Sequence, residues 1–342
     1  YLLFKHRLDD GRYILSATLR HDTVLGITNL FVNPDSEYCE ASVDGEQWII
    51  GQNAAERLKY HGYNAVVKKK IQGGELIGKK TTEFDGSTVL ILPAYFLDPN
   101  VGTGLVHSVP SDSPDDLIAL KELQNDEGTC KKFGLNIAEV RKIMPIPVLN
   151  TPDYGNVAAE AMLKKHGITS QKQRGKLEEA KKELYRISHY TATFNQLYKS
   201  KFSTNLEGKK VDEGEDTIKK DLIKEGFALR YYEPTGKVVC RCLTECVVKV
   251  VDDQWFIEYN DPEWKKAAHE CLDSMSIYPE IVRKQFHYVI DWLDHWACTR
   301  EYGLGTKLPW DDKWVIESLS DSTIQMAYGT ISKYLLHPEE YG

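Results

Sequence analysis

The hydrophobic periodicity of this chain changes from strand-like to helix-like near its middle, and this change constrains the fold most. In the first 110 residues, short alternating or β-branched runs are separated by Gly, Asp and Asn, which is typical of strands joined by turns. These runs predict strands over residues 13–18, 28–32, 47–50, 65–71, 88–92 and 105–109. Two helices are expected among them, one over 54–60 with Asn53 as its N-cap, and one starting at Ser113-Pro114.

From residue 156 to 226 the pattern is helical. We expect helices over 157–166 with Asn156 as cap, from Ser170 onward, and over 216–225. A β-branched run at 238–251 predicts a strand, and further helices are expected over 262–275, 279–299 and 320–336. The pattern therefore predicts an α/β protein with a β-rich domain at 1–155, a helical connector at 156–235 and a mixed domain at 236–342.

Composition excludes some function classes. A content of 42% hydrophobic and 27% charged residues argues against a disordered chain. The net charge of −8 argues against a general nucleic-acid binder, yet residues 164–210 hold 12 Lys/Arg against 4 Asp/Glu. Such a basic segment fits a polyanion contact, and it equally fits a solvated, salt-bridged helical hairpin.

The seven cysteines and the lack of a signal-peptide pattern predict free thiols in the cytoplasm. Cys240, Cys242 and Cys246 would share one side of a continuous strand, but structural zinc sites usually show paired C-x2-C units and four ligands, so buried thiols are preferred over zinc. The longest apolar run, at 89–97, has half of the roughly 18 residues that a membrane span needs. Because the sequence opens without methionine, we expect it to be part of a longer protein.

Two polar segments are candidates for a site. Residues 18–23 (TLRHDT) follow a predicted strand, and their hydroxyl, guanidinium and carboxylate groups can surround a small polar ligand or form a hydrogen-bonded turn. Residues 102–110 (GTGLVHSVP) lead into the helix start at Ser113, where glycines allow a ligand to approach the backbone closely. Asp116 in the first helical turn can bind an ammonium group or act only as a capping-box residue. His107 is a weak candidate base.

Further motifs extend over essentially all 342 residues and give the chain a resemblance to leucyl-tRNA synthetases of the archaeal and eukaryotic-cytosolic type. Residues 18–23 resemble the family's T-x-R-P-[DE]-T element of the editing domain, and residues 102–110 its G-T-G-[VI]-V-x-S-V-P stretch with the following aspartate. Residues 291–301 and 303–306 are similar to the returning half of the synthetic domain, and residues 314–323 to the segment that lines its leucine and adenylate pocket. His21 stands where the family usually has proline.

The resemblance implies a barrel-like editing domain at 1–155, a helical connector at 156–235 and part of a Rossmann-type class I catalytic domain at 236–342. It implies post-transfer editing, the hydrolysis of isoleucyl, valyl or norvalyl esters at the 3′-terminal adenosine of leucine tRNA. It implies three catalytic residues, Thr18, Arg20 and Asp116. The implied substrate-binding residues are Thr23, Asp22, Gly102, Thr103, Gly104, His107, Ser108 and Val109.

In this interpretation Thr23 excludes leucine, Thr18 and Arg20 line the ester, and Asp116 binds the α-ammonium. No metal or cofactor is expected for editing, whereas the full-length family enzyme uses ATP and Mg²⁺. The H-I-G-H and K-M-S-K-S signatures do not occur in these 342 residues, so we expect no leucine activation by this chain alone. Two alternatives stay open: one half of a split synthetase that needs its partner half, and a non-catalytic tRNA-binding fragment.

Overall fold

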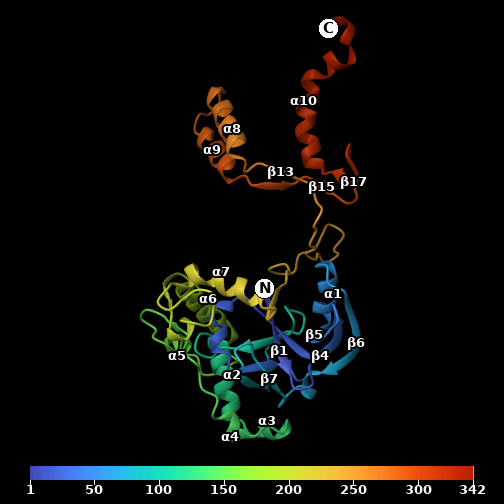
Figure 1. The fold of residues 1–342 in the computed structure, drawn as a ribbon. Helices are drawn as coiled ribbons and strands as arrows, with labels where there is room; N and C mark the ends of the chain where they lie inside the picture. The colour runs from blue at the N-terminus through green and yellow to red at the C-terminus, as the bar shows by residue number, and fades with distance from the viewer. Residues whose placement is uncertain (342) are drawn as a thin grey trace. The chain divides into compact units, whose positions relative to one another are not determined.

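The computed structural model describes residues 1–341, and these form two compact units that divide between Val250 and Val251. The first unit contains a ten-stranded mixed sheet in the order β6-β4-β5-β2-β1-β7-β8-β3-β9, with β12 paired to β1 (Figure 1). Its strands are β1 (Leu2–Leu8), β2 (Tyr13–Thr18), β3 (Asn29–Val32), β4 (Glu37–Val43), β5 (Glu46–Gly51), β6 (Ala65–Gln72), β7 (Lys80–Thr82), β8 (Thr88–Pro93), β9 (Leu105–Ser108) and β12 (Ala228–Arg230).

The sheet curves so that strands distant in this order meet. β2 packs beside β9 although four other strands (β1, β7, β8 and β3) separate the two along the hydrogen-bonded path. A Cβ atom at Gly102, just before β9, would lie 2.6 Å from the Cβ of Ala17 in β2. The strands from β2 to β9 therefore enclose a barrel-like core, as the resemblance implied.

Helices cover the outside of this sheet. α5, α6 and α7 lie together on one side of it, where α6 contacts both α5 and α7 (Figure 1). The helices of the first unit are α1 (Gln52–Tyr60), α2 (Pro114–Gln124), α3 (Glu127–Lys132), α4 (Ile137–Val140), α5 (Ala158–Lys165), α6 (Arg174–Thr191) and α7 (Val211–Lys224). Shorter elements are the 3-10 helices η1 (His21–Gly26), η2 (Gly73–Glu75) and η3 (Gln196–Tyr198) and the strand pair β10 (Leu149–Asn150) and β11 (Thr193–Phe194).

Three predicted helix caps are wrong. The N-cap of α1 is Gly51 rather than Asn53, and that of α5 is Val157 rather than Asn156. α6 begins at Arg174, because the side chain of Gln173 accepts the backbone N–H groups of Thr169 and Ser170 and holds them in a turn. The start predicted at Ser113 is confirmed: Ser113 Oγ accepts the N–H of Asp116 at 3.4 Å.

The second unit contains β13 (Phe256–Glu258), β14 (His295–Ala297), β15 (Thr299–Arg300), β16 (Lys307–Leu308), β17 (Asp311–Ile316), α8 (Pro262–Ser274), α9 (Val282–Trp292), α10 (Ser318–Leu336) and α11 (Pro338–Tyr341). All its described strand pairs are antiparallel. Of its large apolar side chains in residues 251–341, those buried are Leu272, Leu308 and Trp314. This segment therefore forms neither a parallel sheet nor an extensive core by itself.

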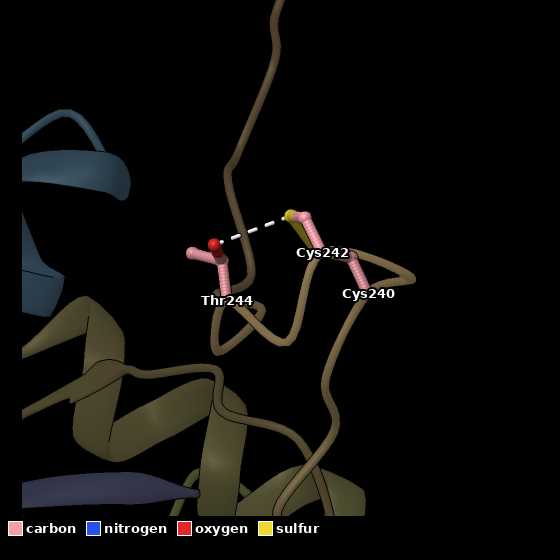
Figure 2. Close-up of a disulfide and its surroundings, with 3 residues drawn as sticks. All are labelled: Cys240, Cys242 and Thr244. Carbon is pink, nitrogen blue, oxygen red and sulfur yellow. Dashed lines mark hydrogen bonds between the residues drawn. A yellow bond between two sulfur atoms is a disulfide. The ribbon is translucent and has the colours of Figure 1, made fainter.

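The predicted strand at 238–251 is absent from the described structure, which has a looped segment there with a single bridge between Val239 and Glu245. The expectation of free thiols is wrong for two cysteines, because Cys240 and Cys242 form a disulfide (Figure 2). The hydroxyl of Thr244 contacts Cys242 Sγ at 3.2 Å. Leu243, between Cys242 and Thr244, adopts a φ of 64°. This left-handed conformation turns the backbone and prevents an extended strand. Cys246 remains a free, half-buried thiol.

Candidate functional site

A cavity of about 360 Å³ lies where the end of β2, η1, β9, the first turn of α2 and one face of α6 meet. The predicted site residues that line it are Thr18, Arg20, Thr23, Gly102, Gly104, His107, Val109 and Asp116. Segments that are more than 80 residues apart in the sequence are thus combined in one pocket. Its volume falls at the lower end of the range for small-molecule sites.

The side chain of Arg20 is fixed on one cavity wall. Its Nε donates to Asp22 Oδ1 at 2.9 Å, and its Nη2 donates to Asp22 Oδ2 at 2.7 Å. The guanidinium also lies over the ring of Tyr185, 4.6 Å from its centre. Its Nη1 is buried without a hydrogen-bond partner among the described residues. Arg20 therefore presents one unused donor within a rigid arrangement.

Thr18 and Thr23 lie on either side of Arg20. Thr18 Oγ1 accepts the N–H of Arg20 at 2.9 Å, and Thr23 Oγ1 donates to the carbonyl of Arg20 at 3.1 Å. Tyr198 donates to the carbonyl of Asp22 at 2.6 Å, which fixes η1 from behind. The hydrogen-bonded turn and the ligand-lining surface, weighed above as alternatives, are both present in this segment.

His21 occupies the position at which the related family has proline. Its Nε2 lies 3.1 Å from the carbonyl oxygen of Glu215 in α7, so the imidazole N–H can tie η1 to that helix. Burial lowers the pKa of His21, which favours this neutral donor.

The two glycines before β9 permit close packing of the backbone. Gly102 and Gly104 have φ values of 56° and 75°, and a Cβ atom at Gly104 would lie 2.8 Å from Pro99 Cα. Their N–H groups are used internally, that of Gly102 by Glu233 at 3.1 Å and that of Gly104 by the carbonyl of Val101 at 2.9 Å. The glycines thus shape the cavity. The close approach of a ligand to their backbone amides, which the sequence pattern predicted, would find both N–H groups already bonded within the protein.

Asp116 connects the start of α2 to the end of β9. Its Oδ2 accepts the N–H of Val109 at 2.8 Å, while the N–H of Ser113 bonds to the carbonyl of Val109. The carboxylate therefore does not make the reciprocal contact of a capping box. Burial raises the pKa of Asp116 to about 7, partly opposed by the Val109 hydrogen bond. A bound cation would favour its ionised form.

A second carboxyl group, Asp112, also lines the cavity. Ser111 donates to its Oδ2 at 2.6 Å, and its Oδ1 is buried without a partner among residues 1–341. Burial raises the pKa of Asp112 to about 7. The cavity thus combines several carboxyl groups, Asp112, Asp115 and Asp116 among them, with the unused donor of Arg20.

The sequence prediction missed the wall that α6 supplies. Arg174, Lys181 and Tyr185 line the cavity, and Arg174 Nη1 lies 2.9 Å from Asp115 Oδ1. Their spacing of seven and four residues places all three on one helix face, and this periodicity was the available signal. Burial lowers the pKa of Lys181, but the neighbouring Tyr185 and Asp115 more than offset this and raise it.

Three predicted site residues lie behind the cavity wall: Asp22, Thr103 and Ser108. Asp22 holds Arg20, and Thr103 Oγ1 donates to the carbonyl of Leu105 at 3.1 Å. The carbonyl of Ser108 accepts the N–H of Thr28 at 3.0 Å. These residues position the lining without contributing to it.

No cluster of three His, Cys, Asp or Glu side chains within the described part of the chain has the arrangement of a metal site. In the same residues, no helix is both long and apolar enough to cross a membrane. The cavity can bind a small ligand through carboxylates, hydroxyls, the guanidinium groups of Arg20 and Arg174 and the ammonium group of Lys181.

Solved structures share this fold. The editing domain of the P. knowlesi cytosolic leucyl-tRNA synthetase aligns with 68% of the chain at a TM-score of 0.62 and 21% identity, covering 96% of that domain. The corresponding P. falciparum domain aligns with 65% of the chain at a TM-score of 0.59 and 21% identity, covering 80% of that chain. The first unit thus has the fold of a synthetase editing domain.

Comparison of the amino-acid sequence with known proteins identifies the synthetase family. The leucine--tRNA ligase of Methanothermobacter thermautotrophicus is 42% identical over 97% of the chain, and that of Aeropyrum pernix is 42% identical over 100% of it. The chain belongs to the leucine--tRNA ligase family. It spans about 35% of the length of these two relatives. No protein-family model matches it.

Proposed function

We propose that this chain hydrolyses wrong amino acids from leucine tRNA in the cytoplasm. The observation that carries the proposal is the single cavity in which Asp116, Arg20, Thr18 and Thr23 meet. An editing site, separate from the pocket that selects leucine for synthesis, is useful because a hydrophobic pocket distinguishes side chains that differ by one methylene only about 10–200-fold.

The side chains suit an aminoacyl ester. An ionised Asp116 binds the α-ammonium of the substrate, because its carboxylate lines the cavity and is held in place there by the Val109 N–H. The free Nη1–H of Arg20 donates to the ester carbonyl, where negative charge develops during hydrolysis. Thr23 limits the space for the amino acid side chain.

The attacking group is a water molecule rather than a protein nucleophile. No cysteine lines the cavity, and the cavity-lining Ser113 uses its oxygen to accept the Asp116 N–H. Water held by Thr18 and the substrate's ribose hydroxyl attacks the carbonyl that Asp116 and Arg20 orient. Catalysis then comes from positioning and electrostatic stabilisation.

The experiment is the incubation of the chain with isoleucyl-tRNA and leucyl-tRNA, both of leucine specificity. We expect release of isoleucine and retention of leucine. If neither ester is cleaved while the tRNA binds, the chain is a tRNA-binding fragment. Leucine-dependent ATP–pyrophosphate exchange should stay at the no-enzyme level, since this chain has neither ATP signature. Recovery of exchange on adding the missing synthetase segments would identify the chain as half of a split enzyme.

A further inference from the structure

A continuous chain of hydrogen bonds runs through the barrel from a buried carboxylate to the cavity. Glu83 Oε2 lies 2.5 Å from His6 Nδ1, His6 Nε2 lies 2.7 Å from Ser16 Oγ, and Ser16 Oγ lies 2.8 Å from His107 Nδ1. The side chains come from β1, β2, β9 and the residue following β7. Their exposed fractions are 7%, 1%, 0% and 7% for Glu83, His6, Ser16 and His107.

Of the four side chains in this hydrogen-bond relay, only His107 reaches the proposed substrate. His107 lines the cavity, while Glu83, His6 and Ser16 do not. A Glu–His–Ser sequence of contacts resembles a nucleophilic triad, but Ser16 Oγ is fully buried between two imidazoles and no ester can reach it. These three residues can therefore act only through His107.

With both imidazoles neutral, one order of protons satisfies every internal contact. Thr81 Oγ1 and His6 Nδ1 donate to Glu83, Ser16 donates to His6 Nε2, and His107 Nδ1 donates to Ser16. This order leaves the lone pair of His107 Nε2 without a partner among the described residues. The reverse order needs an additional proton on His6 or Glu83. Burial lowers the pKa of His107 to about 3, which keeps its ring neutral.

We propose that Glu83, His6 and Ser16 are positioning residues that hold His107 with the lone pair of Nε2 toward the cavity, where it accepts a hydrogen bond from the terminal ribose hydroxyl of the substrate. This role rests on the proposed ester hydrolysis. The ring contact between Phe4 and His107, with centres 5.2 Å apart, fixes the imidazole from its other side. The substrate hydroxyl, held as a donor to Nε2, is then oriented beside the ester.

The first test measures the tautomer and does not depend on activity. Nitrogen-15 NMR of the full chain at pH 8 should show His107 protonated at Nδ1 and unprotonated at Nε2, with the signals assigned by their loss in His107→Gln. Ser16→Ala should remove this preference, and Ser16→Thr, which keeps the hydroxyl, should restore it. A His107 ring protonated at Nε2 in the parent would overturn the proposal.

The second test measures hydrolysis of isoleucyl-tRNA. Ser16→Ala should lower kcat about tenfold with KM nearly unchanged, because the hydrogen bond that orients His107 is lost. Its melting temperature should also fall, because the buried ring nitrogens of His6 and His107 both lose their partner, so the rates are compared well below the melting temperature of either protein. Ser16→Thr should recover most of the rate. The matched control is Ser188→Ala, which removes another fully buried hydroxyl, bonded to the Leu184 carbonyl at 2.7 Å and remote from the cavity lining.

A substrate ending in 2′-deoxyadenosine identifies the hydroxyl. Because the relay acts through that group, Ser16→Ala should cause no further loss on the deoxy ester. An undiminished tenfold loss on the deoxy ester would overturn the ribose assignment, and a parental rate of Ser16→Ala on the normal ester would overturn the positioning role. If the parent cleaves neither ester, the proposed function fails, while the tautomer measurement still decides whether the relay exists.

Discussion

At the residue scale, Thr23 is the side chain whose size should decide which amino acids enter the cavity. It is buried, and its hydroxyl is anchored to the Arg20 carbonyl, so its methyl group has a fixed position. Thr23→Ala should therefore make space for leucine and raise the hydrolysis of leucyl-tRNA by at least about tenfold. Rates on leucyl- and isoleucyl-tRNA measure this. Thr23→Ser keeps the anchored hydroxyl and separates the methyl contribution, and a Thr23→Ala variant that still spares leucyl-tRNA would exclude Thr23 as the size filter.

Asp116 combines a structural contact with the proposed ammonium anchor, and Asp116→Asn distinguishes them. The amide oxygen of asparagine can still accept the Val109 N–H, so the melting temperature should hardly change well below pH 7 and should rise above pH 7, where the parent carries a buried carboxylate. Loss of the negative charge removes a charge-assisted bond of about 1.5–3 kcal/mol, and isoleucyl-tRNA hydrolysis should fall roughly tenfold to a hundredfold. The control is Glu160→Gln, which removes an exposed carboxylate paired with Lys121. If Asp116→Asn hydrolyses isoleucyl-tRNA at the parental rate, Asp116 does not bind the ammonium group and its role is limited to the Val109 hydrogen bond.

Asp112 should make the folded chain less stable as the pH rises. Its folded-state pKa is about 7, whereas an unfolded aspartate titrates near 3.9, so the folded chain binds more protons between about pH 4 and pH 7. The free energy of unfolding should fall across this window, and Asp112→Asn should recover on the order of 1–4 kcal/mol at pH 8 but little at pH 4. Urea titrations at the two pH values test this, with exposed Asp35→Asn as control. An equal effect of Asp112→Asn at both pH values would contradict the assignment.

At the element scale, the basic side chains of α6, which lies within the basic segment 164–210, fall into two groups with different surroundings. Arg174 and Lys181 face Asp115 and the cavity, whereas Lys176 and Lys182 are exposed on the same helix and Lys172 is exposed just before it. No ion pair of these three lysines is found within residues 1–341. The salt-bridged interpretation therefore holds for Arg174 and Lys181, while a polyanion contact stays a prediction for the exposed lysines, which are the ones available to phosphates.

The triple variant Lys172→Gln, Lys176→Gln and Lys182→Gln should weaken tRNA binding and flatten its dependence on salt. Each lost phosphate contact should reduce the slope of log affinity against log salt by about 0.7–0.9. Binding titrations at several salt concentrations measure the slope. The control replaces the same number of exposed lysines elsewhere, Lys79, Lys131 and Lys142. Identical slopes for both triple variants would return α6 to a solvated helix without a role in binding.

The strands show how far local pattern predicts this fold. All six strands predicted in the first 110 residues are present, and their bounds agree within a residue or so because each is half-buried or flanked by clear turns, whereas the one predicted at 238–251 is not formed in the described structure. β1 escaped prediction because Leu2, Leu3 and Phe4 are all buried, so this central strand lacks period-two alternation. β4 escaped because a register shift between Glu40 and Ala41 interrupts its pattern. The cap predicted at Ser170 failed because another local contact replaced it: the side chain of Gln173 accepts the N–H groups of Thr169 and Ser170.

The candidate site was likewise only partly predictable from the sequence. The segments around Thr18 and Gly102 could be found because their polar residues are clustered in sequence. The periodicity of α6 shows that Arg174, Lys181 and Tyr185 share one helix face, but no sequence signal places that face or Asp112 at the cavity, since only the fold brings residues 174–185 beside residues 18–23. The Glu83–His6–Ser16–His107 relay joins four isolated polar residues, each unremarkable in its own strand, and no sequence spacing connects them.

At the scale of the whole molecule, the two units differ in how much apolar surface they bury. The four hydrophobic clusters of the described structure lie within residues 1–231. In residues 251–341, large apolar side chains such as Tyr278, Trp292 and Leu304 are 99%, 70% and 98% exposed. Because burial of apolar surface is the main favourable term in folding, we infer that the second unit requires further synthetase segments to complete its core.

This difference predicts the behaviour of the separated units. A fragment of residues 1–250 should unfold in one cooperative transition close to that of the full chain and should hydrolyse isoleucyl-tRNA at a comparable rate, since it contains every cavity-lining residue. A fragment of residues 251–342 should show helical signal but a broad, weakly cooperative melt, because three buried large side chains cannot offset the conformational entropy of some 90 residues. Calorimetry and circular dichroism of both fragments measure this. A sharp calorimetric transition of the isolated fragment 251–342, together with loss of folding in 1–250, would show that the core is distributed in the opposite way.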